Sequence, residues 1–185
     1  MATTIGVAVA VPDPWGRKLQ DYRSSLGDES AAGIPTHITL MPPFEAEPEE
    51  LPRIERHLAE AAESNPAFTI HLRGTGTFRP VSPVVFVVVV EGISACEQLA
   101  FSIRRGPLAT ELQFPYHPHV TIAQDLDDEC LDKAFDELAS FECRFTVDHF
   151  SLYVHEHPTG WRPTRGFGLV AEPESSQVRV PPRSG

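Results

Sequence analysis

Cysteines are few in this sequence, and long hydrophobic runs are missing from it. The 185 residues include three cysteines, Cys96, Cys130 and Cys143, an odd number without the spacing of a metal site. We therefore expect reduced thiols in a cytoplasmic protein and exclude a disulfide scaffold. No apolar stretch approaches the roughly 20 residues of a membrane span, and the N-terminal segment lacks the basic start of a signal peptide. The sequence thus predicts no membrane partner.

Basic residues are also scarce, with 15 Lys and Arg against 26 Asp and Glu and a net charge of −11. Proteins that hold long nucleic acid need basic surface to displace counterions, so we predict no long-duplex nucleic-acid partner. The acidity is confined to two segments, 45–63 and 125–142, which together carry 15 acidic and 3 basic residues. The rest of the chain has 11 acidic and 12 basic residues and is close to neutral. This charge distribution remains compatible with a small cleft that reads one terminal phosphate.

Each acidic segment has the apolar spacing of an amphipathic helix. Apolar residues recur three and four positions apart in both segments: Leu51, Ile54, Leu58 and Ala61 in the first, and Leu131, Ala134, Phe135 and Leu138 in the second. This period places the apolar side chains on one helix face and leaves the acidic side chains on the other. We predict two helices with solvated acidic faces.

The two halves of the chain repeat one order of elements. β-Branched runs at 5–11 and 84–90 predict an opening strand in each half, and the valine-rich second run predicts a strand buried on both faces. Helices are expected next, at about 14–26 and 93–105. A strand with the tripeptide His-x-Thr follows in each half, 82 positions apart, and then come the acidic helix and a further strand.

This repeat predicts an α+β domain over residues 1–170 that has two similar, interleaved lobes. Its units are about 1–80 and 81–170, and a last β-rich stretch at 165–170 completes the second unit. Neither unit is large enough to bury a core alone. Residues 171–185 are rich in Pro, Ser and charged residues without a period, and they predict a mobile C-terminal tail.

The paired His-x-Thr tripeptides carry the strongest chemical signal. Residues i and i+2 of a strand share a face, so His37 points with Thr39, and His119 points with Thr121. Two equivalent strands then present two imidazoles and two hydroxyls to one groove, which suits displacement at phosphorus. A neutral imidazole takes a proton from the attacking group, an imidazolium protonates the leaving oxygen, and the hydroxyls bind the non-bridging oxygens. Such chemistry requires no metal and no cofactor.

In these residues the sequence resembles the two-histidine (2H) phosphoesterases, in particular their 2′-5′ RNA ligase and cyclic phosphodiesterase-like branch. The resemblance spans roughly residues 1–170 and rests on the segments 36–44 (THITLMPPF) and 115–122 (PYHPHVTI). It implies a bilobal, duplicated fold with pseudo-twofold symmetry, antiparallel sheets that line a central cleft, and helices outside. It also implies that the histidines at 37 and 119 are catalytic and that the threonines at 39 and 121 hold the phosphate.

The resemblance further implies hydrolysis of a cyclic phosphate, either the 2′,3′-cyclic phosphate of an RNA 3′ end or a small cyclic nucleotide. Three alternatives stay open: 2′-5′ RNA ligation as the reverse reaction at the same site, binding of a nucleotide or RNA end without turnover, and a metal-dependent hydrolase. The polarity of the substrate decides which histidine is the base and which is the acid. We expect a monomer that acts on a nucleotide or on an RNA terminal phosphate in RNA processing.

The metal alternative depends on two His-x-His pairs, His117 with His119 and His155 with His157. Neither pair has a third ligand at a fixed spacing, and the second pair falls in a Pro-Gly region that predicts a loop. The sequence therefore favours a site without metal.

Several other residues near the motifs are candidates for binding the substrate. A nucleotide cleft needs a stacking surface, and four aromatic residues fall near motif strands or rim loops: Phe44, Phe78, Tyr116 and Trp161. Each of them also suits a place in the core. Arg79, at the end of an expected strand, is a candidate phosphate contact, and Arg162 and Arg165 beside the last β-rich stretch are alternatives.

Overall fold

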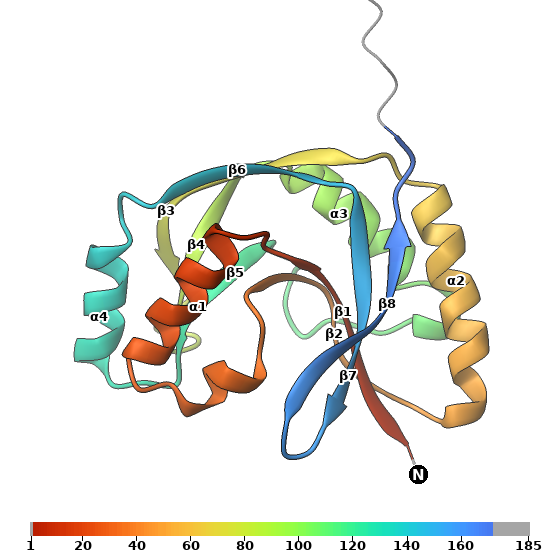
Figure 1. Ribbon diagram of the computed structural model, residues 1–185, viewed down its shortest axis with the longest axis horizontal. Helices are drawn as coiled ribbons and strands as arrows, with labels where there is room; N and C mark the ends of the chain where they lie inside the picture. Colours follow the sequence, from red (N-terminus) through yellow and green to blue (C-terminus); the bar gives the residue numbers. More distant parts are fainter. Residues whose placement is uncertain (1, 172–185) are drawn as a thin grey trace, which may run out of the picture.

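Two four-stranded antiparallel sheets form the centre of the computed structural model, which describes residues 2–171 (Figure 1). The first sheet has the strand order β2-β1-β7-β8 and contains β1 (Thr3–Ala10), β2 (His37–Ala46), β7 (His149–Glu156) and β8 (Gly160–Gly168). The second has the order β5-β4-β3-β6 and contains β3 (Phe68–Thr77), β4 (Val84–Glu91), β5 (His119–Gln124) and β6 (Glu142–Val147). The predicted α+β fold with two antiparallel sheets and outer helices is confirmed.

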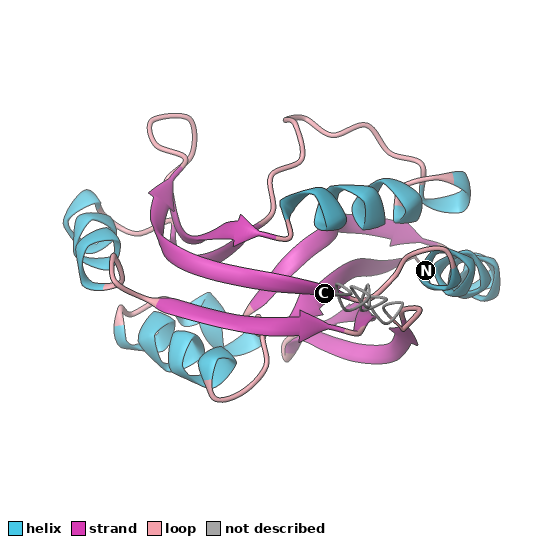
Figure 2. Ribbon diagram, turned by 90° about the horizontal axis from the view of Figure 1, so that it is seen from above, coloured by secondary structure: helices cyan, strands magenta, loops and turns pink. Residues whose placement is uncertain are grey.

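The α-helices pack outside the sheets, and two of them cover the sheet of the other half (Figures 1 and 2). Helix α1 (Trp15–Ser25) joins β1 to β2 of the first sheet, but it packs against β5 of the second, on the side of α4 (Asp128–Glu137). Helix α3 (Ile93–Ile103) joins β4 to β5 of the second sheet, but it packs against β2 of the first and against α2 (Leu51–Glu63). The two halves therefore interlock through their first helices.

Shorter elements occupy the connections between these helices and strands. They are the 3₁₀ helices η1 (Glu29–Gly33), η2 (Pro48–Glu50) and η3 (Gly106–Leu108). Between residues 2 and 171, no helix has the length and apolar composition needed to cross a bilayer.

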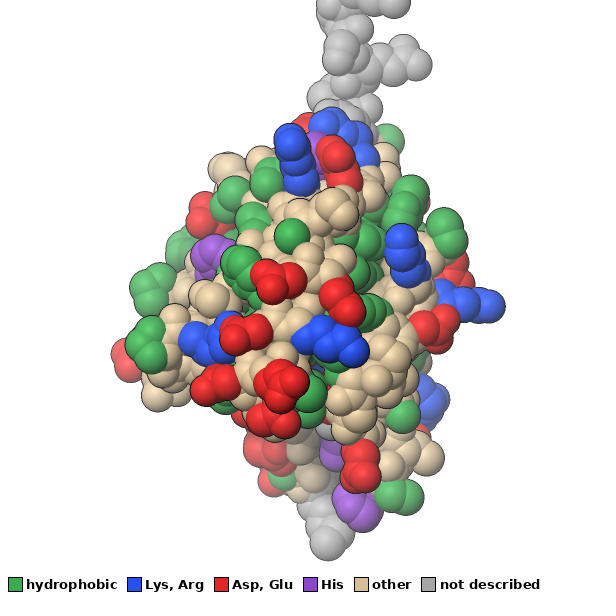
Figure 3. Space-filling model, turned by 90° about the vertical axis from the view of Figure 1, so that its left-hand side faces the viewer, with side chains coloured by type: hydrophobic (Ala, Val, Ile, Leu, Met, Phe, Trp, Pro, Cys, Tyr) green, Lys and Arg blue, Asp and Glu red, His purple; other side chains and the backbone are tan. Residues whose placement is uncertain are grey.

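The two acidic segments fold as the expected amphipathic helices. Ile54 and Leu58 of α2 and Leu131 of α4 are at most 1% exposed, whereas the acidic side chains of α4 face solvent. Helix α4 begins after Asp127, whose carboxylate accepts a hydrogen bond from the backbone N–H of Cys130 (2.8 Å) and so caps the helix. The view from the side on which α4 lies shows acidic side chains gathered on the surface (Figure 3). The net negative charge is thus carried on helix faces turned away from the core.

Strand β4 confirms the prediction of a strand buried on both faces. It lies inside the second sheet, between β3 and β5. The consecutive residues Val85, Phe86 and Val87 are all at most 5% exposed, so both faces of the strand are covered. A run of β-branched and aromatic side chains suits this position because each face packs against apolar neighbours.

The C-terminal hairpin of β7 and β8 differs from the prediction. His155 lies within β7, so the loop expected at 155–157 is wrong for this residue, and the strand expected to begin at residue 165 already begins at Gly160. Buried and exposed side chains alternate over much of β7, which is the pattern of a strand. The hairpin pairs with β1 and therefore completes the first sheet. The single domain over 1–170 stays a prediction, and the predicted tail at 171–185 lies, except for its first residue, outside the described residues.

The two motif strands are edge strands that pair with the opening strands in matching registers. The pairs are His37 opposite Ala10 and Thr39 opposite Ala8 in the first sheet, and His119 opposite Val88 and Thr121 opposite Phe86 in the second. In both strands the pairing skips one residue directly after the threonine, which places a β-bulge at Leu40 and another at Ile122. Strands β2 and β5 also contact each other, so the two sheet edges meet between the lobes.

Candidate functional site

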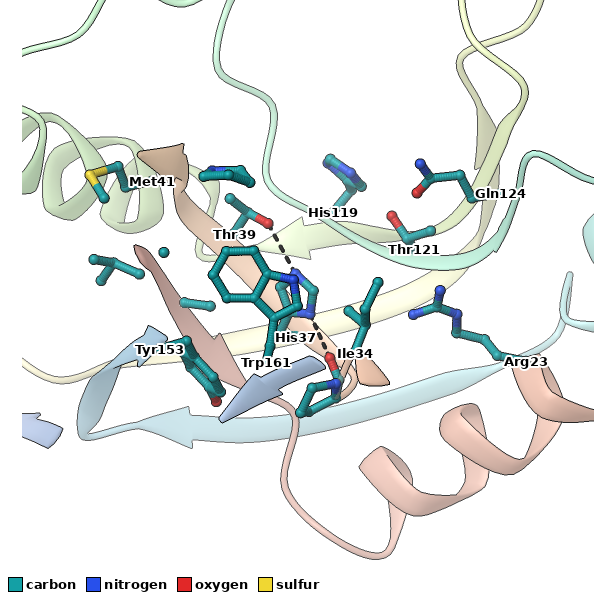
Figure 4. A pocket seen from close by; sticks show the side chains of 15 residues that line it. Arg23, Ile34, His37, Thr39, Met41, His119, Thr121, Gln124, Tyr153 and Trp161 are labelled. Atoms are coloured by element: carbon teal, nitrogen blue, oxygen red, sulfur yellow. Dashed lines mark hydrogen bonds between the residues drawn. The ribbon is translucent and has the colours of Figure 1, made fainter. Parts of the chain in front are cut away.

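A cavity of about 340 Å³ opens where β2 and β5 meet, and both His-x-Thr motifs line it (Figure 4). His37 and Thr39 reach it from β2, and His119 and Thr121 reach it from β5. The alternation of a strand explains why each histidine is accompanied by the threonine two positions later. The intervening Ile38 and Val120 turn to the opposite faces, where they are fully buried in the core.

Both imidazoles are held by a hydrogen bond to a backbone carbonyl oxygen two residues earlier in the chain. The Nδ1 atom of His37 lies 2.5 Å from the carbonyl oxygen of Pro35, and the Nδ1 atom of His119 lies 2.7 Å from the carbonyl oxygen of His117. A carbonyl oxygen can only accept, so each Nδ1 carries a proton and donates it. The proton on Nε2 is then the one that each ring gains or loses. Each histidine is thereby prepared to act as a base when neutral and as an acid when charged.

The two threonine hydroxyls differ in their partners. The Thr39 hydroxyl lies 3.1 Å from Nε2 of His37, and because that nitrogen is unprotonated in the neutral ring, the hydroxyl donates to it. The Thr121 hydroxyl makes no hydrogen bond to any residue in the described part of the chain. One hydroxyl of the pair is therefore engaged in the free protein, and the other is available to a ligand.

Burial lowers the pKa of both imidazoles, because an imidazolium loses solvation in the cavity. For His37 the positive charge of Arg23 lowers the pKa further, and the hydrogen bond to the Pro35 carbonyl opposes both effects. For His119 the backbone hydrogen bond also raises the pKa, while the neighbouring His117 and His37 lower it. Both rings thus favour the neutral form near neutral pH in the free protein.

Trp161 is the aromatic candidate that the structure brings to the cavity. Its ring lies over Gly6 of β1, where an added Cβ would come within 3.2 Å of the indole, so the glycine makes room for the ring. Gly160 precedes it with a positive φ of 90°, and a Cβ there would lie only 2.3 Å from the carbonyl oxygen of Gly33. The tight turn between β7 and β8 therefore rests on η1 and presents Trp161 beside His37 (Figure 4).

The other three aromatic candidates do not line the cavity. Phe78 packs edge-on against His119, with ring centroids 4.9 Å apart and planes at 88°. The Tyr116 hydroxyl donates a hydrogen bond to the carbonyl oxygen of Thr39 (2.8 Å), which ties the two motif segments together. Phe44 is half-buried and packs against the core. Two of these residues thus support motif residues from behind, and Phe44 serves the core.

The predicted arginines are drawn away from the cavity by carboxylates. Arg79 forms ion pairs with Asp132 (2.7 Å) and Asp128 (3.4 Å) of α4 and does not line the cavity. Arg162 pairs with Glu156 and Arg165 with Glu55, and neither of these arginines lines it. The expectation of a phosphate contact from Arg79 thus finds no support in the geometry, because the acidic face of α4 captures its guanidinium group.

Three polar lining residues were not predicted from the sequence: Arg23, Gln124 and Tyr153. Arg23 lies on α1 together with the buried residues Gly16 and Leu19, three and four positions apart, so an arginine on the apolar stripe of a helix was the available signal. Gln124 ends β5 beyond the bulge at Ile122, which shifts the alternation of the strand by one residue. Simple counting from His119 by steps of two therefore passes over it.

The His-x-His pairs do not assemble a metal-binding group. Among residues 2–171, no three His, Cys, Asp or Glu side chains are positioned to hold a metal ion. The His155 ring packs instead against Trp161, with centroids 5.2 Å apart. His117 packs edge-on against Phe78 (5.6 Å).

Comparison with known proteins identifies the family. The family model of the 2′-5′ RNA ligase superfamily matches residues 11–159. A candidate phosphoesterase of Bacillus cytotoxicus is 32% identical over 160 residues, which are 83% of this chain and 91% of that protein.

Solved structures share the fold. Escherichia coli LigT, solved with 3′-AMP, superposes with a TM-score of 0.66 at 20% identity and covers 91% of this chain and 99% of its own. LigT has also been solved with NADP+ and with ATP. The protein TT0787 of Thermus thermophilus gives a TM-score of 0.62 at 22% identity, over 93% of this chain and all of its own. The family resemblance of the motifs is confirmed, and the chain belongs to the 2′-5′ RNA ligase superfamily.

Proposed function

We propose that this phosphoesterase-family protein hydrolyses a cyclic phosphodiester, either the 2′,3′-cyclic phosphate of an RNA 3′ end or a small cyclic nucleotide, and that it needs no metal ion. The observation that carries the proposal is the meeting of both His-x-Thr motifs in one cavity, with each Nδ1 held by a carbonyl oxygen. Two imidazoles with free Nε2 atoms and two hydroxyls supply the groups that displacement at phosphorus requires.

The reaction is attack of water on the phosphorus of the cyclic diester, in which one of the two ribose oxygens leaves and the phosphate stays attached to the other. A neutral imidazole accepts a proton from water through Nε2 while the water oxygen forms a bond to phosphorus. The other ring, as an imidazolium, donates its Nε2 proton to the ribose oxygen as the bond between that oxygen and phosphorus breaks. The product carries one new hydroxyl on the ribose and one on the phosphate, and the two rings have exchanged protonation states. A proton must return through solvent before the next turnover.

The threonine hydroxyls bind the non-bridging oxygens in this proposal. The Thr121 hydroxyl is available in the free protein, whereas the Thr39 hydroxyl donates to His37. On binding, the Thr39 hydroxyl turns from Nε2 to a phosphate oxygen and leaves that nitrogen open to the attacking or leaving oxygen. This switch couples occupancy of the phosphate site to release of the base.

The cavity also suits a nucleoside attached to the phosphate. Its volume of about 340 Å³ lies at the lower end of ligand pockets, and Trp161 offers an aromatic face on which a base stacks. The solved complexes of LigT with 3′-AMP, NADP+ and ATP support a nucleotide as the ligand of this site. We infer a cytoplasmic monomer whose residues 1–170 act as one domain in RNA processing and bind a terminal phosphate.

Ligation is the second candidate function, and the name of the superfamily favours it. Attack of a ribose hydroxyl from a second RNA on the cyclic phosphate uses the same proton transfers as attack of water. The two reactions therefore share His37 and His119 and differ only in the nucleophile. Incubation with an RNA that ends in a cyclic phosphate and an RNA with a free 5′ hydroxyl distinguishes a 2′-5′ joined product from a hydrolysed end.

Hydrolysis of 2′,3′-cyclic AMP in the presence of EDTA tests the proposal directly. We expect turnover with a bell-shaped pH dependence, a product that chromatography identifies as 2′-AMP or 3′-AMP, and loss of turnover in His37→Ala and His119→Ala. His157→Ala, which removes a histidine outside the cavity, is the matched control and retains activity. Full activity in either motif variant, or activity that EDTA abolishes and added metal restores, overturns the assignment. Nucleotide binding without turnover of any cyclic phosphate points to the non-catalytic alternative.

A further inference from the structure

Arg23 is the one residue with a permanent charge among the described residues that line the cavity. It comes from α1, the helix that crosses from the first half of the chain to the second sheet. Figure 4 shows its guanidinium group directed into the cavity, on the side of Thr121 and Gln124. The motif residues supply only neutral hydroxyl donors and titratable imidazoles. Arg23 adds a permanently charged guanidinium group to the lining.

The guanidinium group is buried and only partly satisfied. Its side chain is 3% exposed, and its Nη2 atom donates a hydrogen bond to the Asp28 carboxylate at 2.9 Å. Asp28 is itself buried. The Nε atom is buried without a hydrogen-bond partner in the described part of the chain. Buried donors are almost always paired in native proteins, and a guanidinium has five N–H groups in a rigid fork. The ion pair with Asp28 therefore leaves part of the donor capacity of this guanidinium group unused.

We propose that Arg23 is a phosphate-binding residue of this cavity, which donates hydrogen bonds from its guanidinium group to a non-bridging oxygen of the substrate phosphate. The proposal deepens the function proposed above and rests on it for the identity of the substrate. A planar guanidinium matches the spacing of two phosphate oxygens. Asp28 holds one edge of the group in place, so little side-chain entropy is lost when an anion binds. The proposed ligand is accordingly a phosphate ester whose negatively charged phosphate group binds inside the cavity.

The surroundings of His37 support this assignment. Burial is the first cause of the lowered pKa of this imidazole, and the positive charge of Arg23 lowers it further. The guanidinium group therefore acts electrostatically on the imidazole of His37, which lines the same cavity. Among the described residues, the ionisable groups that line the cavity are Arg23, Tyr153 and the two motif histidines. No carboxylate is among these lining residues, and Asp28 contacts the cation from outside the lining.

A purely structural role of Arg23, as the partner of Asp28, is the alternative that the experiment must exclude. Replacing Arg23 alone removes the cationic partner of a buried carboxylate, and such a variant can fail to fold. The informative pair is therefore Asp28→Asn, which keeps the guanidinium group, and the double variant Arg23→Met with Asp28→Asn, which removes both charges together. Arg79→Met is the matched control, because Arg79 is also paired with carboxylates but lies outside the cavity.

Titration calorimetry with inorganic phosphate provides the test, with thermal unfolding as the check that each variant is folded. We expect Asp28→Asn and Arg79→Met to bind phosphate as tightly as the natural protein or more tightly. The double variant should bind phosphate about 10- to 100-fold more weakly, the usual effect of losing a hydrogen bond from a charged group. Equal affinity in the double variant and in Asp28→Asn overturns the proposal.

The kinetic counterpart separates binding from proton transfer. If 2′,3′-cyclic AMP is a substrate, the double variant should raise KM by a similar factor, and the two limbs of its pH profile should remain. The phosphate titration needs no turnover, so it stands even if the protein does not hydrolyse this compound. Failure of hydrolysis with intact Arg23-dependent phosphate binding rejects the proposed function alone, and the converse result rejects the role of Arg23 alone.

Discussion

The two lobes present the same motif to the cavity but surround it differently. In the first sheet, the strand beside the motif has the small residues Gly6 and Ala8, and the cavity extends over them toward Tyr153 and Trp161 (Figure 4). In the second sheet, the equivalent neighbour of Thr121 is Phe86.

In the second lobe, phenylalanine rings pack beside the motif histidine. The Phe86 ring packs against Phe78 with centroids 4.4 Å apart and planes tilted by 37°, and both ring centroids lie about 5 Å from that of His119. The duplication has therefore kept the reacting groups alike and changed their cross-strand neighbours. One lobe leaves room for a ligand, and the other fixes a histidine.

The charged groups around the two histidines also differ. His37 has the permanent cation Arg23 near it, whereas His119 lies among aromatic rings and has only the titratable His117 and His37 as positive neighbours. The pKa is lowered for both rings, by different neighbours. The polarity of the bound substrate therefore decides which ring is the base and which is the acid.

Removing either imidazole should have the largest effect on activity. His37→Ala and His119→Ala are each expected to lower kcat/KM for 2′,3′-cyclic AMP by about 10² to 10⁴, because each ring transfers a proton in the same step. Steady-state kinetics measures the change. The double variant should lose little more than the stronger single variant, since the rings act as a unit. Additive losses would show that the two lobes do not form one site.

Removing either threonine hydroxyl should have the next largest effect. Thr39→Val and Thr121→Val keep the shape of the side chain and remove a donor to the phosphate, so we expect a loss of about 10² in kcat. The exposed residue Thr146 of β6 provides the matched control as Thr146→Val. Normal rates in both motif variants would contradict the proposed binding of the phosphate by the threonine hydroxyls.

Variants of Trp161, in the first lobe, and of Phe78, in the second lobe, should change different kinetic constants. Trp161→Ala removes the stacking surface and should raise KM by about 10-fold, within the range of base–aromatic stacking. Phe78→Ala loosens the ring packed against His119 and should lower kcat while KM changes less. The reverse pattern would contradict the assignment of one lobe to binding and of the other to holding His119.

The smallest expected effect concerns stability against pH. Burial lowers the pKa of both imidazoles in the folded protein, so the unfolded chain, with an ordinary value of about 6.5, binds protons first as the pH falls. The free energy of unfolding is therefore at its full value above pH 6.5 and decreases as the pH falls toward the lower folded-state pKa values.

Denaturant titrations between pH 8 and pH 5 measure this slope. Replacing both rings, as His37→Gln with His119→Gln, should flatten it, and each single replacement should flatten it in part. An equal slope in the natural protein and the double variant would show that neither ring is disfavoured in its charged form.

The sequence predicts the fold class and the pairing of the motifs because both depend on short-range patterns. Period-two alternation around His37 and His119 sets the faces of their strands, and helical spacing sets the acidic helices. The hairpin of β7 and β8 is predicted less well, because the Pro-Gly region around His155 and His157 indicates a loop, whereas the alternation over β7 indicates a strand. Its pairing with β1 is a long-range contact that no local pattern encodes.

The substrate-binding residues were harder to predict for the same reason. Arg79 looked suitable by its position after a strand, but an ion pair with α4, about 50 residues away in sequence, removes it from the cavity. Arg23 reaches the cavity because α1 crosses to the other sheet. Gln124 reaches it because of a bulge. Each of these outcomes depends on tertiary packing, which residue spacing alone does not specify.

Imidazole NMR during a titration with 3′-AMP tests most directly whether the two motifs form one phosphate site. The account predicts that the ring nitrogens of His37 and His119 both shift, with one shared dissociation constant, and that both pKa values rise as the bound phosphate stabilises the charged rings. A response of one ring alone, or two rings that saturate at different concentrations, would contradict it.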